Sequence, residues 1–205
     1  MIGKVNISVI VSLVFACALV SGEVINALKL AKRCEATGPD GTDWANEFDK
    51  PVDFLCERGK ALTSIKSVYS SCRRDRVWSF GCEIQKPVKK DNLECQRTDF
   101  LNNWDEPVFK FCNDGGFIAG MYSEHSNSAE DRRFKIDCCR DASKKTKYRT
   151  TDCFSVKLTE NYKEDINFEL KQANVIRGLF SMHKNSKEDR LWYAIVCTLK
   201  GKRIY

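Results

Sequence analysis

Residues 123–139 read SEHSNSAEDRRFKIDCC, and this stretch decides the fold. The same pattern returns 58 residues later (189 − 131 = 58) as SMHKNSKEDRLW, at residues 181–192. A weaker copy, DRVWSFGC, stands 56 residues upstream (131 − 75 = 56), at residues 75–82. Three copies of Asp-Arg-x-aromatic at nearly constant spacing indicate a chain built from internal repeats.

Each copy extends towards the amino terminus through two further segments. The first ends in a cysteine, or in a leucine in the third copy, and covers 48–56, 104–112 and 162–170. The second is apolar and covers 62–69, 118–125 and 176–183. Short apolar runs with polar boundaries are typical of strands. One repeat therefore predicts a strand, a turn, a strand, a polar loop and a final strand.

The Asp-Arg segment itself predicts a strand in which the arginine shares a face with the aromatic residue two positions later. An arginine on an inward face is costly unless it is paired, so we expect a carboxylate partner and a cation–π contact. The candidate carboxylates are Asp75, Asp131, Asp189, Asp49 and Asp105. We interpret the motif as a structural device rather than a ligand site. Its members are Asp75, Arg76, Trp78, Asp131, Arg132, Phe134, Asp189, Arg190 and Trp192.

These segments resemble the dermatopontin family, whose repeats carry Asp-Arg-x-Trp-x-Phe-x-Cys. The match lies in Asp75–Cys82, in Asp131–Cys139 with its doubled cysteine, and in the Trp104-Asp105-x-Pro107 opening of the second repeat. The resemblance covers roughly residues 44 to 197. This chain departs from the pattern at Phe134, which replaces the usual tryptophan. Further departures are Ala194 in the last aromatic stretch and the added cysteines Cys34 and Cys72.

The resemblance implies a non-enzymatic extracellular protein. Members of that family act in matrix assembly, bind proteoglycan and collagen, and support cell adhesion. Invertebrate relatives are implicated in blood-cell aggregation and biomineral matrix, and some in stinging animals are cytotoxins. The first hypothesis is thus a matrix or adhesion protein that binds glycosaminoglycan, collagen-like proteins or the cell surface. The alternative is a secreted cytotoxin or agglutinin on the same scaffold.

Residues 1–22 have the form of a secretory signal, with Lys4 at the start and an apolar core from Val9 to Val20. No later segment is apolar enough to predict a membrane span. Removal of the signal takes away Lys4 and Cys17 and leaves 33 basic against 28 acidic residues, a net charge of +5. Ten cysteines remain (11 − 1 = 10). An even count in an oxidising compartment predicts five disulfides, each contributing ~2–4 kcal/mol.

The repeats constrain how these cysteines pair. Cys56 and Cys82 stand where Cys112 and Cys138 stand in the next repeat, which favours Cys56–Cys82 and Cys112–Cys138. Cys139 would then pair with Cys95, although the exchanged pairing, Cys95–Cys138 with Cys112–Cys139, is nearly as consistent with the sequence. Two more pairs complete the set, namely Cys153–Cys197 and Cys34–Cys72.

The pattern as a whole predicts one all-β, disulfide-rich domain with long polar loops. A single repeat has too few strands to fold alone, so three repeats with approximate threefold symmetry are expected to share one core. We place a lead-in segment at 23–43 and the domain at 44–205. The repeats cover about 44–95, 104–153 and 162–205.

Two basic connectors are the strongest functional lead. The clusters comprise Lys86, Lys89 and Lys90 in the first connector and Lys144, Lys145, Lys147 and Arg149 in the second. Such clusters attract sulfated polysaccharide, acidic protein or anionic membrane, although many are only solvated loops. For an exported protein this favours a glycosaminoglycan or proteoglycan partner over nucleic acid.

The two histidines, His125 and His183, occupy equivalent repeat positions, with Tyr69 in the third. Two imidazoles and a phenol are a poor metal set, so we interpret them as strand residues satisfied by their neighbours. Neither a nucleophile elbow nor a separate orienting carboxylate accompanies them. The sequence therefore predicts no enzyme, no metal and no cofactor.

Overall fold

The computed structural model describes residues 24, 35–84, 90–143, 146–171 and 174–203, without the side chains of 90, 146, 147, 202 and 203. The chain divides into two units, 1–35 and 36–205, and the second carries the fold described below. Several expectations fall outside the described residues. They concern the signal segment 1–22, Cys34, Lys86, Lys89, Lys144 and Lys145.

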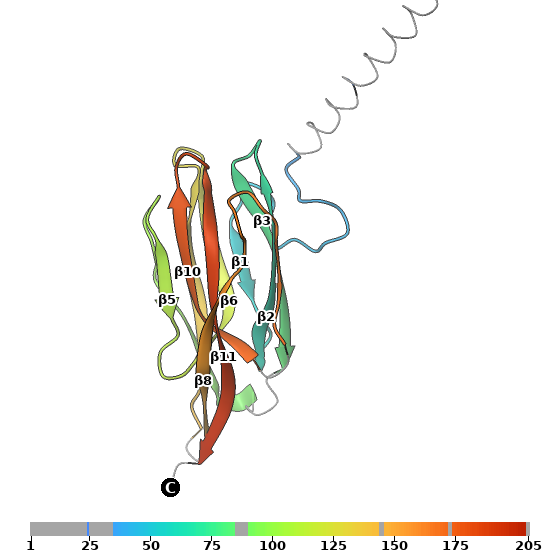
Figure 1. Ribbon diagram of the computed structural model, residues 1–205. Coiled ribbons are helices and arrows are strands. Elements are labelled where there is room, and N and C mark those ends of the chain that lie inside the picture. Colours follow the sequence, from blue (N-terminus) through green and yellow to red (C-terminus); the bar gives the residue numbers. More distant parts are fainter. Residues whose placement is uncertain (1–23, 25–34, 85–89, 144–145, 172–173, 204–205) are drawn as a thin grey trace, which may run out of the picture. The chain divides into compact units, whose positions relative to one another are not determined.

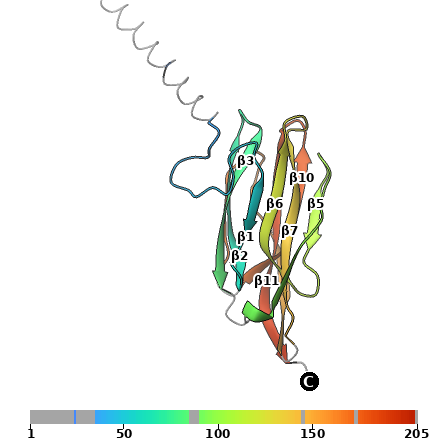
Figure 2. The ribbon, with the colours of Figure 1, turned by 180° about the vertical axis from the view of Figure 1, so that it is seen from behind.

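The second unit is built from strands, which confirms the all-β expectation (Figures 1 and 2). Each repeat supplies one short strand and two long ones. The first repeat gives β1 (Val52–Leu55), β2 (Lys60–Ser70) and β3 (Asp75–Ile84). The second gives β5 (Val108–Phe111), β6 (Phe117–Ser126) and β7 (Asp131–Asp141). The third gives β9 (Ile166–Glu169), β10 (Asn174–Lys184) and β11 (Asp189–Arg203).

Connecting segments add two strands and one short helical turn. The turn is η1 (Lys90–Asn92), and the strands are β4 (Leu93–Arg97) and β8 (Thr146–Lys157). The sequence analysis assigned residues 140–149 to a loop, but β7 reaches Asp141 and β8 already begins at Thr146. Alternation explains the difference, because Tyr148 packs against the core and Thr150 is buried, while Arg149 between them is exposed.

The strands form three sheets, and each sheet is shared between two repeats. Their strand orders are β1-β6-β7-β4, β5-β10-β11-β8 and β3-β2-β9. We call them sheet A, sheet C and sheet B, respectively. In each, the short strand of one repeat pairs antiparallel with the long hairpin of another: β1 with β6, β5 with β10 and β9 with β2. Each repeat therefore contributes a strand to a sheet formed mainly by another repeat, so the three repeats depend on one another for their folded structure.

The three hairpins share their irregularities as well as their sequence. Each first strand has a bulge at the same place, between Leu62 and Ser64, Ile118 and Gly120, or Ile176 and Gly178. A side chain at Gly120 or Gly178 would collide at 2.6 Å with a carbonyl of the exchanged strand, that of Phe54 or Lys110. Glycine at these bulges thus lets the borrowed strand approach closely.

The core meets at three aromatic side chains, one from each Asp-Arg segment. Trp78, Phe134 and Trp192 are each 1% exposed and pack edge to face, at an interplanar angle of 80° in every pair. Their centroids lie 4.9–6.4 Å apart, the range that aromatic pairs prefer. The arginine preceding each ring by two residues is therefore brought next to the same centre.

Disulfides join strands both between sheets and within them: in the described part of the chain, Cys56–Cys82 links the end of β1 to β3 and Cys112–Cys138 links the end of β5 to β7, whereas Cys95–Cys139 joins β4 to β7 in sheet A and Cys153–Cys197 joins β8 to β11 in sheet C. The first two span 26 residues each and the last two span 44 each, so both kinds recur with the repeat. At the doubled cysteine, Cys138 pairs with Cys112 and Cys139 with Cys95, not the exchanged way. Cys72 is also disulfide-bonded, and its expected partner Cys34 lies outside the described residues.

Candidate functional site

Three arginine–aspartate pairs join the repeats to one another. Each pair is bidentate, with Nε and Nη2 of the arginine donating to the two carboxylate oxygens over 2.6–2.7 Å. The pairs are Arg132–Asp75, Arg190–Asp131 and Arg76–Asp189. The second repeat thus binds the first, the third binds the second, and the first binds the third, which closes a ring.

Backbone groups complete each pair in the same way. The aspartate also accepts a hydrogen bond from a backbone N–H, over 2.6–2.8 Å, and the donors are Asp49, Asp105 and Lys163. All three donors have a positive φ, between 64° and 70°. Such a conformation costs a non-glycine residue about 1–3 kcal/mol. We attribute the recurrence of this backbone conformation to the direction that it gives the N–H, which points at the carboxylate.

The arginine finds a further partner in the carbonyl of the next residue along. Nη2 donates over 2.9 Å to the carbonyl oxygens of Lys50, Glu106 and Glu164. None of the six paired side chains is more than 4% exposed. Nη1 of Arg132 also donates to the hydroxyl of Ser123, whereas Nη1 of Arg76 and of Arg190 has no hydrogen-bond partner among the described residues. A buried bidentate pair fixes geometry strongly, and removing one partner leaves a buried charge.

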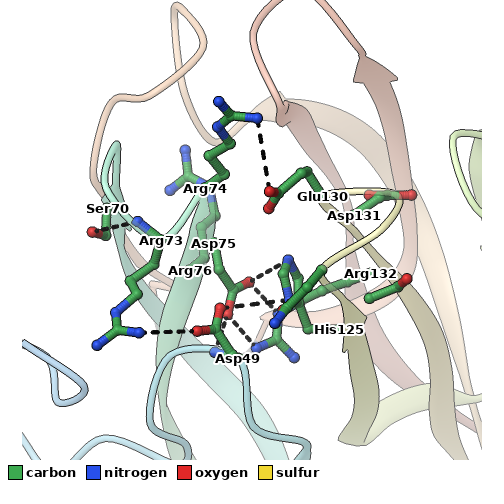
Figure 3. A network of polar contacts seen from close by, with 12 residues as sticks. Asp49, Ser70, Arg73, Arg74, Asp75, Arg76, His125, Glu130, Asp131 and Arg132 are labelled. Carbon is green, nitrogen blue, oxygen red and sulfur yellow. Dashed lines mark hydrogen bonds and ion pairs between the residues drawn. The ribbon is translucent and has the colours of Figure 1, made fainter. Parts of the chain in front are cut away.

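A second ring of residues lies beside the first, and here the repeats differ. We name each interface by its two repeats. At the 1–2 interface, Nδ1 of His125 lies 3.6 Å from Asp49 and Nε2 lies 3.9 Å from Asp75 (Figure 3). At the 2–3 interface, His183 stands between its own two carboxylates, with Nδ1 3.1 Å from Asp105.

At the 3–1 interface both residues change together. Lys163 stands where Asp49 and Asp105 stand, and Tyr69 stands where the histidines stand. The Lys163 ammonium lies 5.3 Å from the centre of the Tyr69 ring. Burial raises the pKa of Tyr69 above its ordinary value, and the charge of Asp189 adds to the effect. At the 3–1 interface, a lysine ammonium over a tyrosine ring thus takes the place of a histidine between two carboxylates.

Each histidine group has the composition of a cation site. Ligand atoms of Asp49, Asp75 and His125 lie within 4.8 Å of one another, as do those of the equivalent group at the 2–3 interface. However, each imidazole presents one ring nitrogen to each carboxylate instead of one nitrogen to both. The inner carboxylate, Asp75, already accepts Arg132 on both oxygens. This arrangement does not suit a metal ion, because the two carboxylates lie at different ring nitrogens.

The histidines are less well satisfied than the sequence analysis expected. Nδ1 of His125 lies 3.0 Å from Oδ1 of Asn127, but Nε2 has no hydrogen-bond partner in the described part of the chain. His183 has none there at either nitrogen, although its side chain is only 1% exposed. A cavity of about 20 Å³ lies at this centre, enough for about one water molecule. The ring is therefore a joint between repeats and offers little room for a substrate.

The outer faces of the sheets carry the chain's other chemistry. On sheet A, cations alternate with aromatic rings, at 4.2–5.8 Å between each charged centre and a ring centroid. The row runs Trp104, Arg133, Phe100, Lys135, Tyr122, Arg97. Carboxylates neutralise both arginines: Glu124 pairs with Arg133, and Asp137 and Asp53 pair with Arg97. The hydrogen bond with Asp137, followed by that with Asp53, raises the pKa of Arg97 further above its ordinary value.

Two of the sequence-predicted basic residues, Lys147 and Arg149, lie in β8 at one end of sheet C. In the β8–β11 pairing, Lys147 stands opposite Lys202 and Arg149 opposite Lys200. All four positions lie on one face of the ribbon, because Tyr148, between Lys147 and Arg149, packs against the core, and Leu199, which precedes Lys200, is buried. Lys90 lies in η1, away from this pairing. The end of the second connector and the carboxyl-terminal part of β11 thus form one cationic ribbon.

Sequence reasoning missed several residues of the joint. Asn46 and Asn102 bridge the backbone on either side of the motif, from the carbonyl of Arg76 or Arg132 to the N–H of Trp78 or Phe134. Lys163 and Tyr69 were not connected with one another. The repeat offset alone would have found both sets, since each member lies 56 to 58 residues from its counterpart.

Known proteins share this sequence pattern. The family model for Dermatopontin matches residues 46–201. The Hemagglutinin/amebocyte aggregation factor of Limulus polyphemus is 36% identical over 160 residues, which cover 77% of this chain and 88% of that protein. The Dermatopontin of Biomphalaria glabrata is 30% identical over 148 residues, covering 72% and 95%. Millepora cytotoxin-1 of Millepora dichotoma is 30% identical over 158 residues, covering 74% and 65%.

No solved structure matches the chain. In the described part of the chain, no helix is long and apolar enough to cross a membrane. The family match spans far more than half of the sequence and contains all three Asp-Arg segments that build the ring of ion pairs. The chain therefore belongs to the dermatopontin family.

Proposed function

We propose that this protein is a secreted, non-enzymatic component of the extracellular matrix that binds sulfated glycosaminoglycan. The observation that carries the proposal is the cationic ribbon of β8 and β11, where Lys147 faces Lys202 and Arg149 faces Lys200. Like charges directly opposite each other on a ribbon are destabilising unless an anion lies between them. A flexible polyanion with closely spaced sulfates supplies such charge along the whole ribbon.

The scaffold supports a binding role rather than catalysis. Of the buried charged residues in the described part of the chain, six form the ring of ion pairs between repeats, Asp137 is paired with Arg97, and Asp141 accepts hydrogen bonds from two backbone N–H groups. We infer that the repeats are related by an approximate threefold axis through this ring, because the pairs, the backbone donors and the exchanged strands all recur with the same order. A scaffold locked in this way presents surface residues at fixed spacing, which suits attachment to matrix or cell surfaces.

Heparin affinity tests the proposal directly. Replacing the four ribbon residues Lys147, Arg149, Lys200 and Lys202 by serine should move elution from a heparin column to clearly lower salt. Retention of the parent protein should weaken steeply with ionic strength, because exposed charges are screened within about 10 Å at 0.1 M salt. Thermal stability should change little, since the two described side chains, Arg149 and Lys200, are exposed.

A matched variant controls for net charge. It loses four other exposed lysines, Lys50, Lys66, Lys171 and Lys187, and so has the same formal charge as the ribbon variant. The control should elute much closer to the parent than the ribbon variant does. Equal loss of retention in both variants would show that net charge alone governs binding and would remove the ribbon from the proposal.

An agglutinin or cytotoxin on the same scaffold is the second candidate. Two of the relatives bear the names Hemagglutinin/amebocyte aggregation factor and Millepora cytotoxin-1. The observation that favours this candidate is an exposed apolar face on sheet C, where Phe109 is 62% and Met182 is 41% exposed. Agglutination of red cells by the parent protein, lost in the ribbon variant, would assign the ribbon to cell bridging.

A further inference from the structure

The outer face of sheet C is apolar across three strands. Four aromatic rings run over it in contact, with centroids 5.2–6.2 Å apart, in the order Phe111, Phe109, Phe180 and Tyr193. Three aliphatic side chains extend the patch on the same face by strand alternation, namely Met182, Leu191 and Ile195. None of these seven residues belongs to the hydrophobic core cluster.

The internal repeats show that the fold does not require this composition. The hairpin positions of Phe180 and Met182 are filled by Tyr122 and Glu124 in sheet A and by Lys66 and Val68 in sheet B. Those of Leu191, Tyr193 and Ile195 are filled, in register, by Arg133, Lys135 and Asp137 in sheet A and by Val77, Ser79 and Gly81 in sheet B. Since the same backbone tolerates charged and small residues elsewhere, the apolar face of sheet C calls for a reason other than folding.

Contiguous exposed apolar surface of this kind marks a contact with another molecule. The charges around the patch indicate which kind of molecule it contacts. Lys157 stands opposite Tyr193 in the sheet, Lys184 follows Met182 on β10, and the guanidinium of Arg177 lies 5.9 Å from the centre of the Phe111 ring. Of the carboxylates close by, Glu160 pairs with Lys157. The rim of the patch is therefore mainly cationic.

The same face continues into the cationic ribbon. Along β11 the outward positions pass from Tyr193 and Ile195, across the bulge after Val196, to Lys200 and Lys202. Arg149 lies across from Lys200, whose one carboxylate partner among the described residues is Asp152. One sheet face thus carries aromatic side chains at its centre and cations at its margin and end.

We propose that the outer face of sheet C docks onto an anionic phospholipid bilayer. The aromatic and aliphatic side chains would enter the boundary between headgroups and acyl chains, where amphipathic aromatic rings are favoured. The lysines and arginines would meet lipid phosphates and acidic headgroups, each contributing roughly 1 kcal/mol near such a surface. Two copies packed face to face would instead bring these cations against one another, which disfavours self-association through this face.

This inference shares the cationic ribbon with the proposed function but depends on the apolar patch, so the two can fail separately. The deciding variant replaces Phe109, Phe180 and Met182 by glutamine. Binding is measured by co-sedimentation with vesicles of phosphatidylcholine alone and of phosphatidylcholine with about one third phosphatidylserine. Heparin retention and sedimentation equilibrium without vesicles are measured on the same samples.

We expect the parent to bind the anionic vesicles, and the apolar variant to lose at least about tenfold in partitioning while keeping its heparin retention. The ribbon variant should weaken in both assays. The matched control replaces Tyr122 on sheet A by glutamine, at the position equivalent to Phe180, and leaves the net charge unchanged. It should bind vesicles like the parent.

Three results would overturn the proposal: no vesicle binding by the parent, equal binding by the apolar variant, or self-association of the parent that the apolar variant abolishes. The last would assign the face to a second copy of this chain. The single variant Phe109→Gln guards against misfolding, because Phe109 lies on the short edge strand β5 and is 62% exposed. It should reduce vesicle binding in the same direction with an unchanged unfolding transition.

Discussion

The 1–2 and 3–1 interfaces share their backbone hydrogen bonds but differ in the charges of the side chains beside the ion pair. At the 1–2 interface, His125 lies between the carboxylates of Asp49 and Asp75. At the 3–1 interface, Lys163 replaces the first carboxylate and Tyr69 replaces the imidazole. The two substitutions fit each other, because a phenol ring accepts a cation over its face and the Lys163 ammonium lies 5.3 Å from the centre of the Tyr69 ring.

What stays constant across all three interfaces is the bidentate Arg–Asp pair with its two backbone partners. The difference therefore separates two layers of the joint. The inner ion pair sets the geometry between repeats, and the outer pair of residues adjusts the local charge. Breaking the inner layer should cost far more than exchanging the outer one.

The largest effect is expected from Arg132→Ala at the 1–2 interface. The change leaves Asp75, whose side chain is 2% exposed, as a buried carboxylate without its cation. Removing one partner of such a pair costs about 3–5 kcal/mol. Arg132 also donates to the hydroxyl of Ser123 over 3.0 Å. The free energy of unfolding, measured in urea with the disulfides intact, should fall accordingly.

Arg74→Ala is the control for that measurement. Arg74 sits on the rim of the same cluster, with a side chain 54% exposed and its ion-pair nitrogen 3.7 Å from Glu130. An exposed pair of this kind contributes ~0–1 kcal/mol. If Arg132→Ala were no more destabilising than Arg74→Ala, the inner layer would not be what holds the repeats together.

The same residues show which features of the fold could be predicted from the sequence. The repeat spacing predicted strands, the inward arginine and its need for a carboxylate, and the paired cysteines at equal offsets. Each of these follows from local alternation or from comparing copies. Periodicity and spacing can be read from the sequence without any knowledge of the fold.

Which carboxylate each arginine binds could not be derived that way. Asp75 is one residue from Arg76, yet Arg76 binds Asp189 of the third repeat. The choice depends on how the three hairpins meet, which in turn depends on the exchanged strands β1, β5 and β9. The cationic ribbon was missed for the same reason, because only the β8–β11 register brings Arg149 opposite Lys200.

A charge exchange at the 1–2 interface should have an intermediate effect and tests the outer layer directly. Asp49→Lys alone places an ammonium beside His125 and removes one ion-pair partner of Arg73, so it should destabilise the protein. Adding His125→Tyr rebuilds the chemistry of the 3–1 interface and should recover part of the loss. The coupling free energy from the double-mutant cycle should be favourable by roughly 1 kcal/mol, within the range for contacting residues.

Additive effects of the two substitutions would contradict the view that these positions form one unit. The equivalent exchange in the other direction, Lys163→Asp with Tyr69→His, provides the second cycle. It should show coupling of the same sign. Agreement between the two cycles would separate the outer layer from local differences in loop packing.

The smallest expected effect concerns alkaline solution and the 3–1 interface alone. Burial, and then the charge of Asp189, raises the pKa of Tyr69, so the folded protein keeps the phenol proton at a pH where the unfolded chain, with an ordinary tyrosine pKa of about 10, has lost it. The folded state then binds more protons than the unfolded state, and the free energy of unfolding falls as pH rises above about 10.

Tyr69→Phe removes this pH-dependent contribution along with the hydrogen bond to the carbonyl of Lys187. The variant should therefore be less stable than the parent near neutral pH by a small amount, and the gap should narrow between pH 10 and 11. The two proteins differ only at residue 69, so the difference between their urea midpoints isolates the contribution of Tyr69. A gap that stays constant over that range would show that Tyr69 ionises as readily in the folded protein as in the unfolded chain, and that the 3–1 interface does not shield it.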